Sequence, residues 1–186
     1  MLKRIVQLTI ALLVLITTMS VQAKSETPHH VQSMVKQERH TPKAKERVQG
    51  PTRTLKDFID RHCTKKCVDP RRLDDVVAKA SIRHRVPEKL ILSVIRVESA
   101  FKQEAISGTQ KGNMQIVVPL HRKRFHGRNP MILAVNIDVG TEILSECLVR
   151  KHGNINKTAR CYNGGGDPAY EVKIRQALIE LKTVEL

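Results

Sequence analysis

The chain has 186 residues, a length that suits one domain with appendages. Hydrophobic residues make up 40% and charged residues 27%, as in ordinary globular proteins, but tryptophan is absent, so the core must consist mainly of Ile, Leu, Val and Ala. The net charge of +15 favours an anionic partner, with a merely solubilising surface as the alternative; three Phe and two Tyr are too few to favour single-stranded nucleic acid, whose binders use stacking aromatics.

Residues 1–23 have the layout of a secretory signal peptide. Lys3 and Arg4 form a positive start, residues 5–16 are almost unbroken apolar sequence, and Val21-Gln22-Ala23 is a small-x-small cleavage site. The apolar core is shorter than the roughly 20 residues of a membrane span, so we expect cleavage, with an uncleaved inner-membrane anchor as the alternative. The sequence therefore predicts a periplasmic protein, in an oxidising compartment where paired cysteines persist.

Residues 24–68 are predicted to form a basic tether that is largely disordered. Up to about residue 54 the segment is rich in Lys, Arg, Gln, Thr, Pro and His, and its apolar residues are isolated. Such a composition buries too little surface to offset the entropy of ordering the chain. His29 and His30 could bind a metal, but two adjacent histidines with no partner cluster are a weak signal. The chemistry expected below implies no metal and no organic cofactor.

A short helix is expected from about residue 55, followed by Cys63 and Cys67. A local disulfide is favoured over a metal site, although a helical pair four residues apart would need a distorted backbone to close. Cys147 and Cys161 flank a predicted turn and would face one another on a helix hairpin, which suggests a second disulfide. Four cysteines allow three connectivities, and the sequence alone does not choose among them.

Residues 69–186 are predicted to form a mainly helical domain. Asp69-Pro70 is a good helix start, and apolar residues then recur at helical spacing as far as His84. A second helix should follow Val86-Pro87, and further helices are expected at about residues 119–125, 132–151, 154–162 and 170–181. Residues 102–112 are polar and predict a loop, with a short β-hairpin within 102–117 as an open alternative.

Glu98 interrupts the apolar face of the second helix. A helical template anchored at Ile91 places Val94, Ile95 and then Glu98 on one face, so a carboxylic acid occupies a position that the pattern assigns to the core. Burial disfavours the carboxylate and raises its pKa toward the range of a general acid. The alternative is that the helix ends here and Glu98 turns into solvent.

Four short blocks follow one another in a specific order. They are Glu98-Ser99 with Phe101, Gly112-Asn113-Met114-Gln115-Ile116 with Pro119, Asn136-Ile137 with Gly140, and Cys161-Tyr162-Asn163 with Gly165. In this order and spacing, residues 74–181 resemble the catalytic domain of the soluble lytic transglycosylases. The resemblance implies a lysozyme-like, goose-type helical fold with at most a minimal β-hairpin.

The resemblance also implies roles for individual residues. Glu98 matches the single catalytic acid of the family. The substrate-binding residues that it implies are Ser99 beside the acid, Met114 and Gln115 in the wall of the saccharide cleft, Tyr162 and Asn163 facing the glutamate, and Tyr170 as a further cleft tyrosine. The chain departs from the family pattern at Thr109, Asn113 and Cys161, where the family usually has Gly, an apolar residue and Ala, and the first two departures affect the shape of the cleft wall.

The substrate implied is peptidoglycan, and the expected reaction uses one carboxyl group twice. Most glycoside hydrolases need two carboxylates, but Glu104 lies in the predicted loop, Asp138 lies in the long helix, and neither matches a role in the family. Glu98 would act as acid and then as base, leaving a 1,6-anhydro end on N-acetylmuramic acid (MurNAc). A lysozyme-type hydrolase and a non-catalytic wall-binding factor are the alternatives.

The resemblance finally suggests a cellular context. Small exported members of the family often open the wall locally for a secretion, conjugation or pilus apparatus. We therefore expect a monomer that acts on glycan strands beside such an apparatus, with no nucleic-acid partner.

Overall fold

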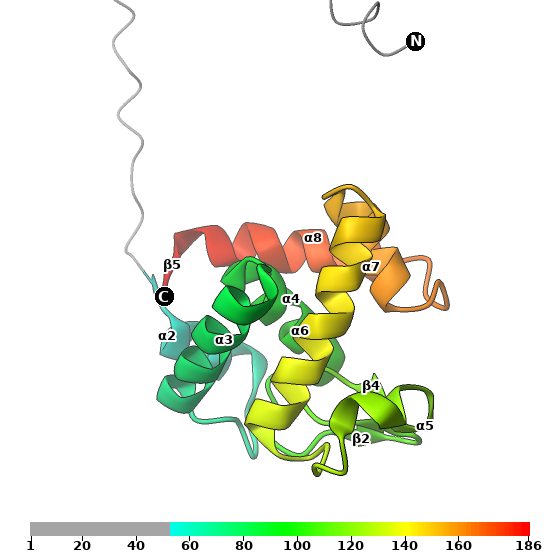
Figure 1. Cartoon of the computed structure of the whole chain (residues 1–186). Helices are drawn as coiled ribbons and strands as arrows, with labels where there is room; N and C mark the ends of the chain where they lie inside the picture. The colour runs from blue at the N-terminus through cyan, green and yellow to red at the C-terminus, as the bar shows by residue number, and fades with distance from the viewer. Residues whose placement is uncertain (1–52) are drawn as a thin grey trace, which may run out of the picture. The chain divides into compact units, whose positions relative to one another are not determined.

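A computed structural model describes residues 53–186 of the chain (Figure 1). The predicted signal peptide and most of the predicted tether fall on residues 1–52 and lie outside the described residues. The α-helices are α2 (Leu55–His62), α3 (Pro70–His84), α4 (Glu88–Ser99), α5 (Val118–His121), α6 (Leu133–Arg150), α7 (Ile155–Tyr162) and α8 (Tyr170–Glu180), with short 3₁₀ helices η1 (Arg122–Phe125) and η2 (Leu181–Thr183).

Helix α4 forms the centre of the core. Its residues from Leu90 to Ile95 are all buried, and it packs against α3 and α8. The helix ends where Ala100 and Phe101 adopt left-handed φ angles of 49° and 61°, which turn the chain sharply. The buried Phe101 ring then packs edge-on against Phe58, with ring centroids 5.7 Å apart. The turn thus fixes the end of α4, which carries Glu98, against the core.

Helix α2 belongs to this same core. Its apolar residues Leu55, Phe58 and Ile59 are buried, and a capping box between Thr54 and Asp57 fixes its first turn. The compact part of the chain therefore begins before the expected boundary at residue 69, because the apolar face of α2 is covered by the rest of the domain. Just before it, β1 (Arg53–Thr54) pairs in parallel with β5 (Val184–Glu185).

A small antiparallel sheet follows α4. Strands β2 (Ile106–Ser107), β3 (Gln110–Lys111) and β4 (Ile116–Val117) pair in sequence order. The structure therefore contains the short β-hairpin that the sequence left as an alternative within residues 102–117. The expectation of a mainly helical domain with a minimal β-hairpin is confirmed. Within residues 53–186, no helix combines the length and the apolar character that crossing a membrane requires.

Two disulfides join neighbouring segments. Cys63 pairs with Cys67, and Cys147 pairs with Cys161, each with Cα atoms 5.7 Å apart. The first pair does not lie within a helix, because α2 ends at residue 62 and Cys63 has extended backbone. This ending removes the geometric conflict that a helical pair four residues apart would face. The second disulfide ties the end of α6 to α7.

We expect replacement of both Cys147 and Cys161 by Ser to lower the free energy of unfolding by about 3 kcal/mol, because it opens a loop with a sequence separation of 14 residues. Chemical denaturation of the variant and of the parent chain measures this difference. The corresponding Cys63 and Cys67 variant is a matched control, for which the same loop-entropy argument gives only about 2 kcal/mol. An unchanged free energy of unfolding in the first variant would contradict the expectation.

Candidate active site

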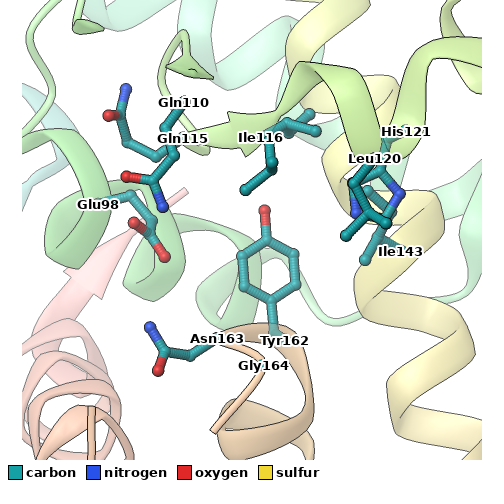
Figure 2. A pocket seen from close by; sticks show the side chains of 11 residues that line it. Glu98, Gln110, Gln115, Ile116, Leu120, His121, Ile143, Tyr162, Asn163 and Gly164 are labelled. Carbon is teal, nitrogen blue, oxygen red and sulfur yellow. The ribbon is translucent and has the colours of Figure 1, made fainter. Parts of the chain in front are cut away.

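Glu98 lies in the last turn of α4 and faces a pocket open to solvent (Figure 2). The residue itself is half-buried, so its carboxyl group is shielded from water but still accessible. The pocket is lined by Glu98, Gln110, Gln115, Ile116, Val117, Leu120, His121, Ile143, Tyr162, Asn163 and Gly164. The small sheet, the α5 segment, α6 and the end of α7 thus surround the end of α4.

Burial raises the pKa of Glu98 to about 7, from an ordinary value of 4.5. A hydrogen bond from Tyr170 and the positive charge of Lys173 oppose this rise in the pKa, but they do not cancel it. The Tyr170 hydroxyl donates to Oε1 of Glu98 over 2.6 Å. Both protonation states of Glu98 are therefore well populated near neutral pH, as a group that first gives and then takes a proton requires.

Gln115 forms the wall of the pocket beside Glu98. Its backbone is left-handed, with φ at 44°. Its side-chain Nε2 donates to the carbonyl oxygens of Ala105, over 3.0 Å, and Gly112, over 2.7 Å. The amide nitrogen is thus committed to the loop. These two hydrogen bonds hold the amide group at the edge of the pocket, the position that the resemblance predicts for Gln115.

Asn136, a fully buried residue of α6, holds the loop that carries Gln115. Its Oδ1 accepts from the backbone N–H of Met114 over 2.8 Å, and its Nδ2 donates to the carbonyl oxygens of Lys111 and Pro130 over 2.9 and 3.0 Å. Gly112 allows this approach, since a Cβ at that position would lie 2.3 Å from Nδ2 of Asn136. Asn136 belongs to one of the four sequence blocks, but its role depends on contacts that the sequence does not reveal.

Met114 and Ser99 do not line the pocket, in contrast to the roles carried over for them. The Met114 side chain is fully buried and packs on Gly140, where a Cβ would lie 2.5 Å from its sulfur. A side chain with no exposed surface cannot touch a glycan. Ser99 is also buried, and its hydroxyl donates to the carbonyl oxygen of Ile95 over 3.0 Å. Both residues support the site from the core.

The two tyrosines have different partners. Tyr162 lines the pocket, and its hydroxyl donates to the carbonyl oxygen of Met114 over 2.8 Å. Tyr170, at the start of α8, is the tyrosine that contacts Glu98. Asn163 lines the pocket beside Tyr162, and its Oδ1 accepts from the backbone N–H of Asp167 over 2.8 Å. The predicted cluster of Tyr162, Asn163 and Tyr170 is therefore assembled around Glu98, with the direct contact made by Tyr170.

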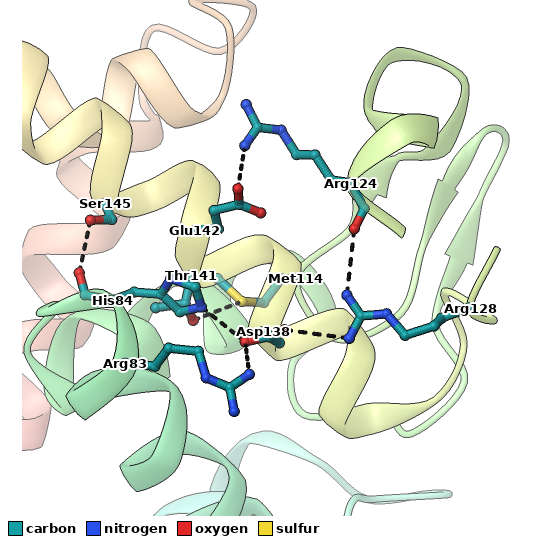
Figure 3. Close-up of polar contacts among 9 residues, drawn as sticks. All are labelled: Arg83, His84, Met114, Arg124, Arg128, Asp138, Thr141, Glu142 and Ser145. Atoms are coloured by element: carbon teal, nitrogen blue, oxygen red, sulfur yellow. Dashed lines mark hydrogen bonds and ion pairs between the residues drawn. The ribbon is translucent and has the colours of Figure 1, made fainter. Parts of the chain in front are cut away.

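Glu98 is the only carboxylate that lines the pocket within residues 53–186. Asp138 of α6 is engaged elsewhere, where it accepts from Arg83 over 2.8 Å and lies 2.9 Å from Nε2 of His84 (Figure 3). Glu104 is exposed in the loop before β2. In the same part of the chain, no group of three or more His, Cys, Asp or Glu side chains is placed to hold a metal ion.

An apolar side of the pocket was missed by the sequence analysis. Leu120 and Ile143 lie together on the side away from Glu98 (Figure 2), and Leu120 is 75% exposed. The segment that carries Leu120 is fixed to α6, because Arg124 forms ion pairs with Glu142 over 3.0 Å and with Glu146 over 2.7 Å. Neither spacing nor periodicity marks Leu120, since α5 is only four residues long.

The geometry defines a mainly helical domain with one carboxyl group of raised pKa in an open pocket. Residues 75–177, more than half of the chain, match the family model described as the transglycosylase SLT domain. The chain belongs to this family. It is a peptidoglycan lytic transglycosylase and thus a lyase, as the resemblance implied. No solved structure matches the chain significantly.

We expect Glu98→Gln to raise the free energy of unfolding at pH 8 by about 1–3 kcal/mol and to change it little at pH 4. The folded-state pKa of Glu98 is about 7 and its ordinary value is 4.5, so the charged form is disfavoured in the folded state, and this cost appears as pH rises from 4.5 through 7. Glutamine resembles the protonated form and avoids the cost. Denaturant titrations at several pH values measure the difference, and a gain that shrinks with rising pH would contradict it.

Replacing Tyr170 by Phe removes the hydrogen bond that stabilises the Glu98 carboxylate, so the pKa of Glu98 should rise further. The pH at which activity falls on the alkaline side should then move upward. Initial rates between about pH 5 and about pH 9 measure this shift. Tyr162→Phe is the matched control, because the hydroxyl group of Tyr162 donates to the carbonyl oxygen of Met114 and not to Glu98. An equal shift in both variants would argue against a specific role for Tyr170.

Proposed function

We propose that Glu98 is the catalytic group and that it cleaves the β-1,4 bond between MurNAc and N-acetylglucosamine (GlcNAc). Two observations support this role. Glu98 is the sole carboxylate among the described residues that line the pocket, and burial brings its pKa to about 7. The first observation carries the proposal, because the pocket offers no other carboxyl group, and the raised pKa is consistent with a group that acts as acid and as base near neutral pH.

In the first step, protonated Glu98 gives its proton to the glycosidic oxygen, and the bond from that oxygen to C1 of MurNAc breaks. GlcNAc leaves with a free hydroxyl group. Positive charge develops at C1, where the acetamido group of the same sugar can support it, as in substrate-assisted glycosidases. This support replaces the second carboxylate that most glycoside hydrolases use.

In the second step, the Glu98 carboxylate takes the proton from the C6 hydroxyl of MurNAc. The C6 oxygen forms a bond to C1, which closes a 1,6-anhydro ring and consumes no water. Glu98 is protonated again and ready for the next bond. Tyr170 stabilises the carboxylate between the two steps, because its hydroxyl lies 2.6 Å from Oε1.

The other pocket residues would position the sugar. Gln115 and Asn163 present amide groups beside Glu98. The Gln115 oxygen can accept a hydrogen bond from the acetamido group, and the Asn163 nitrogen can donate one to it, because the other atom of each amide is engaged with the backbone. Leu120 and Ile143 offer an apolar surface to the face of a sugar ring. Tyr162 would act indirectly, since its hydroxyl is committed to the backbone of the loop that carries Gln115.

We also propose that the protein acts in the periplasm and opens the wall locally for a secretion, conjugation or pilus apparatus. The signal-peptide layout of residues 1–23 and membership of the family support this context. The mass of the mature chain after export tests cleavage after Ala23. Assembly of such an apparatus in cells that express only the Glu98→Gln variant tests the role.

We expect Glu98→Gln to reduce glycan cleavage at least about hundredfold, because the amide can neither give nor take the proton. Digestion of purified peptidoglycan, with mass spectrometry of the fragments, measures both rate and product. Anhydro-ended fragments from the parent chain support the proposed reaction, whereas reducing ends would show a lysozyme-type hydrolase. Glu104→Gln is a matched control that neutralises an exposed carboxylate nearby and should keep full activity.

Full activity of the Glu98→Gln variant would overturn the catalytic assignment. A parent chain that binds peptidoglycan but releases no fragments would instead indicate a wall-binding factor.

A further inference from the structure

A second recess adjoins the catalytic pocket at the end of α7. It is lined by Lys151, Lys157, Arg160, Cys161, Gly164 and Gly165, and we call it the basic recess. Gly164 lines both the basic recess and the catalytic pocket. No atom lies within 4 Å of the position that a Cβ would occupy at Gly164 or at Gly165. The space above this backbone, between the catalytic pocket and the basic recess, is therefore open. A polymer in the catalytic pocket can therefore extend a side branch into the basic recess.

The cations of the basic recess come from two helix ends that are covalently joined. Lys151 directly follows α6, and Lys157 and Arg160 lie three residues apart on α7, hence on one side of that helix. The Cys147–Cys161 disulfide ties these two helices together. The disulfide thus joins the two segments that carry the basic groups.

The basic recess has more positive than negative charge. Arg160 forms an ion pair with Glu171 of α8 over 3.0 Å, and this is the only ion pair of a recess-lining residue within residues 53–186. Lys151 and Lys157 are exposed. Two ammonium groups therefore remain to meet an anion, and a lysine ammonium can donate up to three hydrogen bonds to its oxygen atoms.

We propose that the basic recess binds a carboxylate of the peptide that branches from a MurNAc residue of the strand in the catalytic pocket. This proposal rests on the proposed function. Where a peptide is attached, the lactyl carboxyl group of MurNAc is part of an amide bond and the sugar is uncharged, whereas the peptide itself carries free carboxylates. A basic hollow beside the pocket is therefore complementary to the peptide branch and not to the glycan backbone. Lys151 and Lys157 would favour strands that carry peptides over strands that have lost them.

A second basic hollow is less suited to this role. It is lined by Val118, Arg122, Lys123, Phe125, His126, Gly127, Arg128 and Pro130. It shares no lining residue with the catalytic pocket. One of its cations, Arg128, also lies 3.5 Å from Asp138. Both hollows are basic, so charge alone does not distinguish them. The basic recess is the better candidate because it also shares Gly164 with the catalytic pocket.

The test compares two polymers and two double variants. The polymers are glycan strands that retain their peptides and the same strands after enzymatic removal of the peptides and conversion of the lactyl carboxylates thus freed into methyl amides, so that the peptide-free strands are uncharged. The variants are Lys151→Ala with Lys157→Ala, and the control Lys65→Ala with Lys182→Ala, which removes two exposed lysines that line none of the hollows described here. Rates of anhydro-end formation as a function of substrate concentration, at low and high salt, give kcat and KM for each combination.

For the Lys151 and Lys157 variant we expect about a three- to tenfold rise in KM on peptide-bearing strands, with kcat unchanged, because exposed ion pairs are individually weak. The rise should shrink at high salt, which screens exposed charges. KM on peptide-free strands should not change, and the control variant should match the parent chain on both polymers. If the parent chain cleaves only peptide-bearing strands, the test is the difference in KM between the two double variants on that polymer.

An equal loss on both polymers would overturn the proposal, as would no loss on either, or an equal loss in the control variant. A parent chain that forms no anhydro ends on any strand would overturn the proposed function instead. Thermal unfolding of both variants checks that removing the lysines leaves the fold intact.

Discussion

The buried amide of Asn136 is the interaction on which the geometry of the site depends. It satisfies three backbone groups from two separate segments, one before Gln115 and one at Pro130. Buried backbone groups need partners, and a helix cannot supply them from its own backbone, because its N–H and C=O groups are already paired. The side chain of Asn136 in α6 therefore pairs with these backbone groups. It fixes Met114, whose carbonyl oxygen in turn receives the Tyr162 hydroxyl.

A second constraint concerns Glu98, where stability and chemistry oppose one another. The apolar surroundings that raise its pKa also make its charged form costly in the folded state. Tyr170 and Lys173 limit this cost without removing it. For the proposed reaction the pocket is thus balanced: deeper burial would keep Glu98 protonated and hinder the proposed second step, and fuller exposure would ionise it before the proposed first step.

Much of this arrangement was predictable from local pattern. The helix spans follow from apolar periodicity, and the displaced carboxyl group at residue 98 was visible because a single residue broke that periodicity. The direct partner of Glu98 was harder to identify, since Tyr162 and Tyr170 are both tyrosines and only the packing of α8 on α4 brings Tyr170 to the carboxylate.

The errors share a cause. Met114 was assigned to the cleft wall together with Gln115 because the two match one block of the family. Adjacent residues in a tight loop point in different directions, however, and Gly140 leaves room for the methionine in the core. The role of Asn136 and the exposed position of Leu120 depend on contacts between segments distant in sequence. Such contacts leave no periodic signal in the chain.

The pairing of β1 with β5 has a topological consequence. It brings Arg53 beside Val184, so both ends of the described domain lie together, as Figure 1 shows where β5 approaches α2. A short linker across this gap would close the backbone into a ring without disturbing the core, and the ring could be reopened at the exposed tip of the β2–β3 turn, at Gly108. Such a permuted chain would keep the internal contacts of the domain while changing the order in which its helices are synthesised.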